Sequence, residues 1–223
     1  MIKTWLGFTV FAPLIAAIIT GLGNKRVGAR GATYITVIGM IISCGSAWMM
    51  FYNMIFGGAA IYDAFWYTWA VSGTFSFHVG FLVDHLTVLM MLTVTFVSLL
   101  VHIYSIGYMK GDGGYARFFC YMSLFTFFML MLVGANNLLQ LFFGWEAVGL
   151  VSYLLIGFWF YKDSAAVGSF KAFIVNRVGD CSFVLGIAAV LTTFGSLSYQ
   201  RIFDNTDLLY HATVTIIPGH PWS

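Results

Sequence analysis

The sequence is short of charged residues. Only 8% of its 223 residues are charged and 61% are hydrophobic, whereas soluble domains carry about 25% charged residues. Polar groups are too few to cover a globular surface, which excludes a soluble fold. The net charge is only +2, and the basic residues are scattered, so nucleic acid is not an expected partner. The lipid bilayer is.

Cysteine and proline are also scarce. The three cysteines, Cys44, Cys120 and Cys181, lie far apart in or beside apolar runs. They form no CxxC pair, iron–sulfur spacing or disulfide framework, so we expect them to pack as small apolar residues. We expect no metal site and no cofactor in this chain. A single proline, Pro13, falls inside an apolar run, where it predicts a kink.

Long apolar runs are what the sequence has in abundance. Each run approaches the roughly 20 residues that a membrane-spanning helix needs, and the first lacks a small-residue cleavage site, so we expect it to be retained. We predict an all-α integral membrane protein with about six transmembrane helices. Their expected bounds are Trp5–Leu22, Thr33–Phe56, Asp84–Gly107, Tyr115–Val133, Leu138–Phe160 and Ser169–Phe194.

The basic residues predict the orientation of these helices. Seven of them lie in or beside the connections after the first, third and fifth runs, and two lie on the other side: Lys25, Arg26, Arg30, Lys110, Arg117, Lys162 and Lys171, against Lys3 and Arg201. Under the positive-inside rule, both termini face away from the cytoplasm or mitochondrial matrix.

Two further segments divide the chain. The aromatic-rich segment 57–83 predicts a stretch on the outer membrane surface. Leu208–Ile217 is too short to span, which predicts either an outer loop or a truncated end. We therefore expect helices one and two with an outer-face loop over 1–83, helices three to six over 84–194, and an outer-side tail over 195–223.

Three charged residues lie at depths where the bilayer disfavours charge. Glu146 is ~12 Å from the outer end of its run, Arg177 is ~12 Å from the inner end of the next, and Asp180 lies one turn further. Each charge at a helix centre costs roughly 2.5–3.5 kcal/mol, or roughly 8–10 kcal/mol together. They must therefore face protein or water and meet partners.

Two interpretations of these charges stay open. Arg177 precedes Asp180 by three residues on one helix face, so the two could form a structural salt bridge. Glu146 has no neutralising neighbour on its own helix. Because burial favours the protonated acid and a nearby cation favours the carboxylate, a movable cation beside Glu146 would make a proton relay.

The remaining candidate is His102, near the inner end of the third run. It could belong to a proton path or be a packing residue. Three function classes fit this pattern: a proton or cation translocator, a haem-binding anchor, and a structural membrane subunit. The haem interpretation is weak, because only one histidine lies within a run and two are needed as axial ligands.

Residues 81–194 closely resemble one family, the antiporter-like subunits of proton-pumping NADH:quinone oxidoreductase (respiratory complex I), and in particular the N-terminal part of the largest one. The matching motifs are Gly-Phe-Leu-Val-Asp-His-Leu-Thr (80–87), Val-His-Ile-Tyr-Ser-Ile-Gly-Tyr-Met (101–109), Tyr-Ala-Arg-Phe-Phe (115–119), Gly-Trp-Glu-Ala-Val-Gly-Leu-Val-Ser-Tyr-Leu-Leu-Ile-Gly-Phe-Trp (144–159) and Lys-Ala-Phe-Ile-Val-Asn-Arg-Val-Gly-Asp (171–180).

The resemblance implies a function. Family members translocate protons, driven by quinone reduction in other membrane subunits, and carry no redox cofactor themselves. Glu146 would pair with a lysine on a later helix, Arg177 and Asp180 would tune that pair, and His102 matches a family position. The span 84–194 would begin a proton-translocating repeat. The chain would lie in the bacterial cytoplasmic membrane or, alternatively, in the mitochondrial inner membrane.

The resemblance is incomplete. Family chains are far longer and hold two inverted five-helix repeats, so we expect a fragment, a split-gene product or a truncated chain. A separate chain could then carry the missing helices. The alternative family is the multi-subunit cation/proton antiporters, which share the glutamate; the histidine in 101–109 favours complex I.

Overall fold

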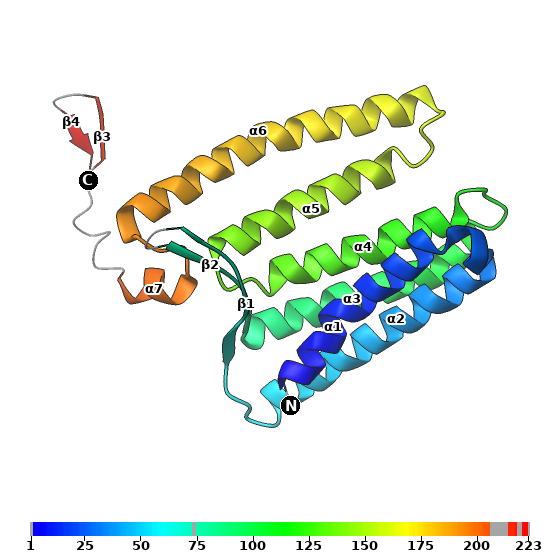
Figure 1. Ribbon diagram of the computed structural model, residues 1–223, viewed down its shortest axis with the longest axis horizontal. Coiled ribbons are helices and arrows are strands. Elements are labelled where there is room, and N and C mark those ends of the chain that lie inside the picture. Colours follow the sequence, from blue (N-terminus) through cyan, green and yellow to red (C-terminus); the bar gives the residue numbers. More distant parts are fainter. Residues whose placement is uncertain (1, 73–74, 206–213, 218–219, 223) are drawn as a thin grey trace.

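Six long helices lie side by side in the computed structural model, which describes residues 2–72, 75–205, 214–217 and 220–222 (Figure 1). All six are long and apolar enough to cross a membrane, so the prediction of an all-α membrane bundle is confirmed. The helices are α1 (Ile2–Leu22), α2 (Asn24–Ile55), α3 (His85–Tyr108), α4 (Tyr115–Val133), α5 (Leu138–Ile156) and α6 (Asp163–Phe194), followed by the short α7 (Tyr199–Asp204).

Three helix ends differ from the prediction by four residues or more. Helix α5 ends at Ile156 instead of Phe160, and α6 begins at Asp163 instead of Ser169, so the connection is shorter and nearer the start of the chain than hydropathy suggests. Helix α2 begins at Asn24 but is interrupted at Gly28, where φ is 62° and ψ is −179°. Glycine adopts this backbone conformation without the strain a side chain would bring.

The helices form a layer that thins towards α6. Helix α1 packs against α2 and α4, α5 packs against α4, and α6 packs mainly against α5. The main core lies among α1–α4, where Leu6, Val10, Met91 and Leu130 are fully buried. Helix α6 forms the edge of the bundle (Figure 1) and exposes large apolar side chains along its length.

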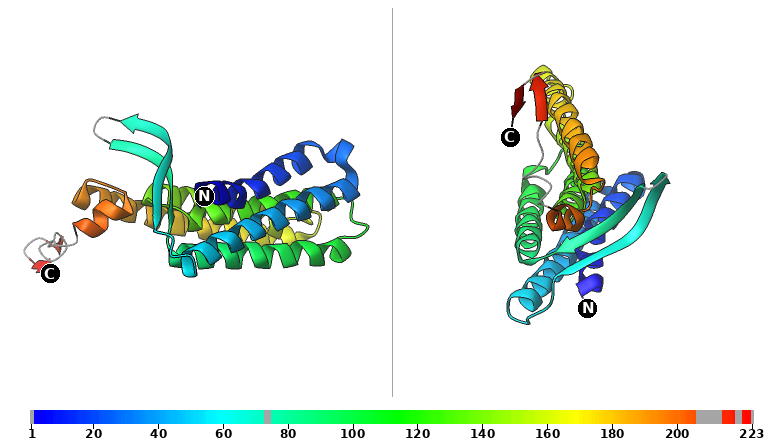
Figure 2. Two further views of the ribbon diagram at one scale, coloured as in Figure 1. Left: turned by 90° about the horizontal axis from the view of Figure 1, so that it is seen from below. Right: turned by 90° about the vertical axis from the view of Figure 1, so that its left-hand side faces the viewer.

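A β-hairpin, which the sequence analysis did not predict, connects α2 to α3. Strands β1 (Tyr62–Ser72) and β2 (Phe75–Val83) are antiparallel and curve past one end of the helices (Figure 2). The hairpin is not confined to the bundle surface, because Phe81 and Val83 belong to the core. Along β1, the hairpin also exposes aromatic side chains, such as Phe65 and Tyr67.

The hairpin fixes the turn between α4 and α5. The Leu82 amide donates to the Gly134 carbonyl at 3.0 Å, and the Gly80 amide donates to Gln140 Oε1 at 2.9 Å. The side chain of Asn137 donates to the His78 carbonyl and accepts from the Gln140 amide. Because Asn137 caps α5, these bonds set the position of that helix.

Little of the C-terminal segment can be compared with its prediction. Of the apolar run Leu208–Ile217, residues 208–213 lie outside the described residues. The described remainder forms β3 (Val214–Ile217), which pairs antiparallel with β4 (His220–Trp222).

Candidate functional site

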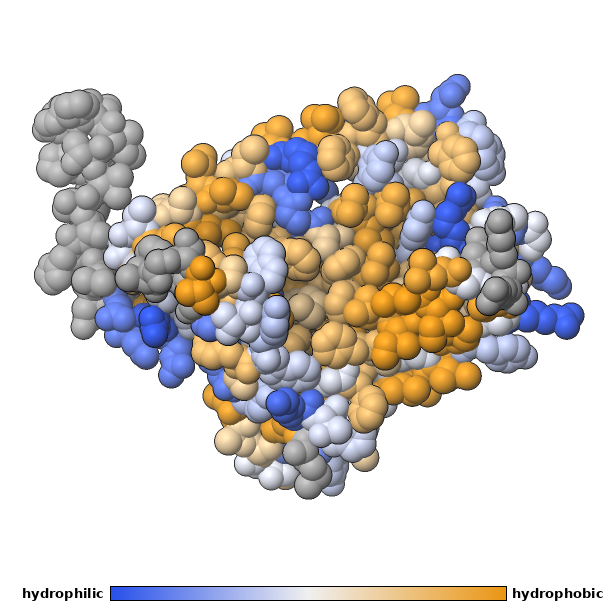
Figure 3. Space-filling model, viewed as in Figure 1, coloured by the Kyte–Doolittle hydropathy of each residue, from blue (hydrophilic) through white to orange (hydrophobic). Residues whose placement is uncertain are grey.

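Glu146 and Arg177 meet between α5 and α6. Glu146 lies near the middle of α5 and Arg177 near the middle of α6, and Arg177 Nη1 donates to Glu146 Oε2 in an ion pair. Figure 3 shows a hydrophilic patch between these two helices, bordered by hydrophobic surface. The partner that Glu146 lacks on its own helix is therefore an arginine on the neighbouring one.

The same guanidinium also faces Asp180. Arg177 Nη1 lies 3.5 Å from Asp180 Oδ2, and Asp180 Oδ1 accepts a hydrogen bond from Trp145 Nε1 at 3.0 Å. The guanidinium lies over the Phe173 ring, 4.8 Å from its centroid. One cation thus stands between two carboxylates, and an indole N–H holds one of them in place.

The three charged side chains differ in exposure. The exposed fraction is 8% for Asp180, 22% for Glu146 and 39% for Arg177. Arg177 is the most accessible of the three. The group carries two negative charges and one positive charge, so it is one positive charge short of neutral.

Close packing on the other side of α5 orients Glu146. A Cβ at Gly144 would lie 2.8 Å from the Leu132 Cα, so α5 approaches α4 more closely there than a larger residue would allow. A step of two residues along an α-helix corresponds to a rotation of about 200° about the helix axis. Gly144 against α4 therefore places Glu146 on the face of α5 that meets α6.

His102 lies elsewhere, buried between α3 and α4 with no exposed area. Its Nδ1 is 2.7 Å from the Ser98 carbonyl oxygen and its Nε2 is 3.1 Å from Ser123 Oγ. Because a carbonyl can only accept, Nδ1 carries the proton and Nε2 accepts from the serine hydroxyl. Among the described residues, no hydrogen bond or ion pair joins His102 to the α5–α6 charges.

Comparisons with known proteins identify relatives of this chain. The family model described as "NADH-Ubiquinone oxidoreductase (complex I), chain 5 N-terminus" matches residues 69–119. A second family model, described as "NADH:quinone oxidoreductase/Mrp antiporter, TM", matches residues 135–218. NADH-quinone oxidoreductase subunit L of Neisseria meningitidis serogroup B is 51% identical over 213 residues, which are 95% of this chain and 32% of that protein. The chain belongs to the antiporter-like subunit family of complex I.

Other relatives span bacteria and a eukaryote. Subunit L of Rickettsia typhi is 42% identical and matches 92% of this chain and 32% of its own length. NADH-ubiquinone oxidoreductase chain 5 of Neurospora crassa is 42% identical and matches 93% of this chain and 29% of its own. The chain thus spans about a third of the length of the curated relatives that it matches.

A solved structure shares the fold. A chain of the membrane-bound sulfane sulfur reductase, an archaeal respiratory membrane complex, aligns with a TM-score of 0.76 at 17% identity. The alignment covers 91% of this chain and 40% of that one. The two chains therefore share the helical bundle, although their sequence identity is low.

Sequence reasoning missed one residue of the site between α5 and α6. Trp145 was noted only as part of a motif, yet its indole donates to Asp180. The available signal was the indole N–H itself, which usually finds an acceptor when a tryptophan lies in an apolar helix. Within the described residues, no group of three His, Cys, Asp or Glu side chains could hold a metal ion.

Proposed function

We propose that this chain is the N-terminal, membrane-embedded part of a proton-translocating subunit of NADH:quinone oxidoreductase, and that Glu146 exchanges protons within it. The observation that carries the proposal is the position of Arg177, which contacts Glu146 and also faces Asp180. Quinone reduction and NADH oxidation would take place in other subunits, and this chain would perform no redox chemistry.

The charge balance supports proton exchange. Two carboxylates share one guanidinium, and an unpaired charge away from water is costly. The group can reach neutrality in two ways: one carboxylate takes up a proton, or a second cation approaches. Either event changes the preferred position of Arg177.

The two carboxylates are not equivalent. Asp180 accepts a hydrogen bond from Trp145, which stabilises its charged form. Glu146, within the described structure, is paired only with Arg177. If Arg177 turns fully towards Asp180, Glu146 loses its counter-ion and its protonated form is favoured. Glu146 would then bind a proton in one arrangement and release it in the other, as a two-state element requires.

The resemblance to the complex I family implies a source for the second cation. A lysine on a later helix would approach Glu146, and Arg177 and Asp180 would tune the field between them. The longer relatives have room for such helices, whether in one polypeptide or in a separate chain. Other membrane subunits of the respiratory complex would be the partners, in a bacterial cytoplasmic or a mitochondrial inner membrane.

A second function has one observation in its favour. The family that matches residues 135–218 includes Mrp antiporter subunits in its description, so the same charges could serve sodium/proton exchange. Replacing sodium by potassium in a transport assay separates the two proposals. Coupled flux that depends on sodium would favour the antiporter.

The decisive experiment is Glu146→Gln in the full-length subunit within the assembled complex. The amide cannot exchange a proton, so we expect proton transfer through this position to slow by about a hundredfold or more. Proton uptake by membrane vesicles should fall relative to NADH oxidation. Asp163→Asn removes a carboxylate at the start of α6 and serves as the control. Normal pumping by an assembled Glu146→Gln complex would refute the proposal.

A further inference from the structure

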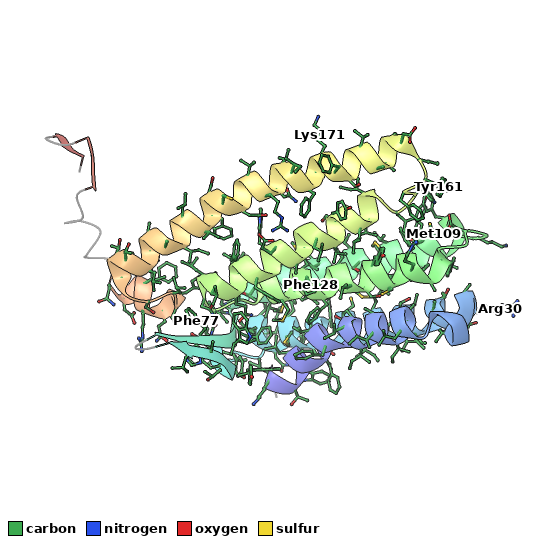
Figure 4. The ribbon with its side chains drawn as sticks, turned by 45° about the horizontal axis from the view of Figure 1, so that its top comes forward. Arg30, Phe77, Met109, Phe128, Tyr161 and Lys171 are labelled. Atoms are coloured by element: carbon green, nitrogen blue, oxygen red, sulfur yellow. The ribbon has the colours of Figure 1, made fainter. Side chains whose placement is uncertain are left out.

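A second polar feature lies at the end of the bundle where the α3–α4 and α5–α6 connections meet. A pocket of about 420 Å³ opens there between α4, α5 and α6. Figure 4 shows Arg30, Met109 and Tyr161 gathered at this end. The residues that line the pocket include Arg117, Tyr121, Tyr153, Leu154, Ser169 and Phe170.

Arg117 brings a positive charge to the pocket wall. Its guanidinium lies over the rings of Phe158 and Phe160, at 4.8 and 5.5 Å from their centroids, and Nη2 donates to the Phe158 carbonyl at 3.3 Å. Its Nε is buried and has no hydrogen-bond partner among the described residues. The aromatic contacts hold the guanidinium in place and leave part of its hydrogen-bonding capacity unused.

No carboxylate among the described side chains lies within ion-pair distance of Arg117. Asp112, which attracts Arg117 electrostatically, has both oxygens engaged: Oδ1 accepts from the Gly114 amide at 2.7 Å and Oδ2 from Trp159 Nε1 at 2.9 Å. The charge of Arg117 is therefore available to an anion in the pocket.

The other residues that line the pocket indicate the chemistry of the rest of the ligand. Tyr121 and Tyr153 line the pocket, and their hydroxyl groups form no hydrogen bond with other described residues. Leu154 and Phe170 supply an apolar wall, and Phe170 is 65% exposed. A ligand that suits this lining has an anionic head and an apolar tail.

The position in the membrane selects the ligand. Arg117 lies in the first turn of α4, at the level of the aromatic residues Trp159 and Tyr161, where lipid headgroups are expected. The distribution of basic residues predicts that this end faces the cytoplasm or matrix. Pockets with basic residues between transmembrane helices on that side bind anionic headgroups.

We infer that this pocket binds an anionic phospholipid. Its phosphate contacts the Arg117 guanidinium and the hydroxyls of Tyr121 and Tyr153, and one acyl chain lies along Leu154 and Phe170. The inference does not depend on proton transfer at Glu146. It places a lipid in the pocket between α4, α5 and α6, at the end of the bundle that holds the α3–α4 and α5–α6 connections.

The test compares two lipid probes on the assembled complex that contains the full-length subunit. Spin-labelled phosphatidylglycerol and spin-labelled phosphatidylcholine are added in detergent, and the immobilised fraction of each is measured. We expect phosphatidylglycerol to be preferred, and Arg117→Gln to reduce that preference about fivefold, the factor that one basic residue near an anionic surface provides. Lys110→Gln removes a charge from the same end without altering the pocket lining and should reduce the preference less than Arg117→Gln does.

A pocket variant and a competition with inorganic phosphate test the same inference independently. Leu154→Trp places a bulky ring in the apolar wall and retains Arg117, so it should reduce the immobilised lipid fraction even if Arg117→Gln fails to assemble. An unchanged immobilised fraction in Leu154→Trp, or an unchanged preference in Arg117→Gln, would overturn the inference. So would an equal loss in Lys110→Gln, which indicates a general surface charge effect. Displacement by millimolar inorganic phosphate would identify a free-phosphate site instead of a lipid site.

Discussion

The α3–α4 interface and the α5–α6 interface each hold polar side chains at membrane depth, but they satisfy them differently. Around His102, between α3 and α4, neutral groups pair within the bundle: the ring contacts the Ser98 carbonyl and the Ser123 hydroxyl, and Ser98 Oγ contacts Thr126 Oγ1. Between α5 and α6 all three principal groups are charged, and their charges do not balance.

Burial separates the two interfaces as clearly as charge does. His102, Ser123 and Thr126 are at most 1% exposed, whereas the Arg177 side chain is 39% exposed. A neutral, fully paired network has one stable arrangement and adds rigidity. An unbalanced charged group at the edge of the bundle can change its proton content or its partner. The comparison indicates that α1–α4 form a scaffold and that α5–α6 present the group that can switch.

The largest effect should follow from Arg177→Ala. Both carboxylates would lose the cation that pairs with them among the described residues, and breaking a buried ion pair from one side costs about 3–5 kcal/mol. Because the group is partly exposed, we expect a value near the lower end, with reduced assembly of the complex. Thermal unfolding of the purified complex and the amount of assembled subunit measure this loss.

A second change tests the cause of that instability. Adding Glu146→Gln to Arg177→Ala should recover part of the lost stability, because one uncompensated charge is then removed. If the double variant is as unstable as Arg177→Ala alone, the loss arises from packing against Phe173 and not from charge.

A smaller effect is expected at the α3–α4 interface. His102→Leu would leave the Ser98 carbonyl and the Ser123 hydroxyl without their ring partner, at a cost of about 1–3 kcal/mol. The expected result is a lower unfolding temperature with proton pumping retained in the assembled complex. His102→Asn, which keeps one donor and one acceptor, should be milder. Lost pumping at normal assembly would show that His102 belongs to the proton path, and the contrast between the interfaces would fail.

Much of the fold could be predicted, because a bilayer demands long apolar helices. The bounds of α4 agree at both ends, since a loop with Gly111, Gly113 and Gly114 precedes it and Gly134 follows it. The end of α5 was placed too late, because Phe158, Trp159 and Phe160 are as apolar as the helix itself. Hydropathy measures composition, and it does not register where backbone hydrogen bonding stops.

The hairpin and part of the site needed long-range information. Strand β2 is held by Gly134 and Gln140, which lie more than fifty residues away, so no local pattern specifies its position. At the site, the sequence required that Glu146 find a partner on another helix, but it assigned Arg177 to Asp180 through their three-residue spacing. The structure shows Arg177 between both, because the approach of α6 to α5 depends on packing that spacing does not encode.

The smallest expected effect concerns a carboxylate that resembles Asp180 but lies outside the membrane. Asp112 accepts from Trp159 Nε1 at 2.9 Å, as Asp180 accepts from Trp145 Nε1 at 3.0 Å. The hydrogen bonds from Trp159 and the Gly114 amide, together with the attraction of Arg117, hold the pKa of Asp112 below its ordinary value. A depressed pKa contributes stability that is present above the ordinary value of the aspartate and is lost as pH falls through the folded value.

Asp112→Asn should therefore lower the unfolding temperature of the subunit slightly at pH 7, and the difference from wild type should shrink as the pH falls below the ordinary pKa of an aspartate. Because Asp112 is only partly buried and lies outside the membrane-spanning helices, screening keeps this effect small. Asp163→Asn removes a carboxylate that has no indole donor among the described residues, and it serves as the control. A difference that stays constant down to pH 3 would mean that the Asp112–Trp159 bond acts through shape alone.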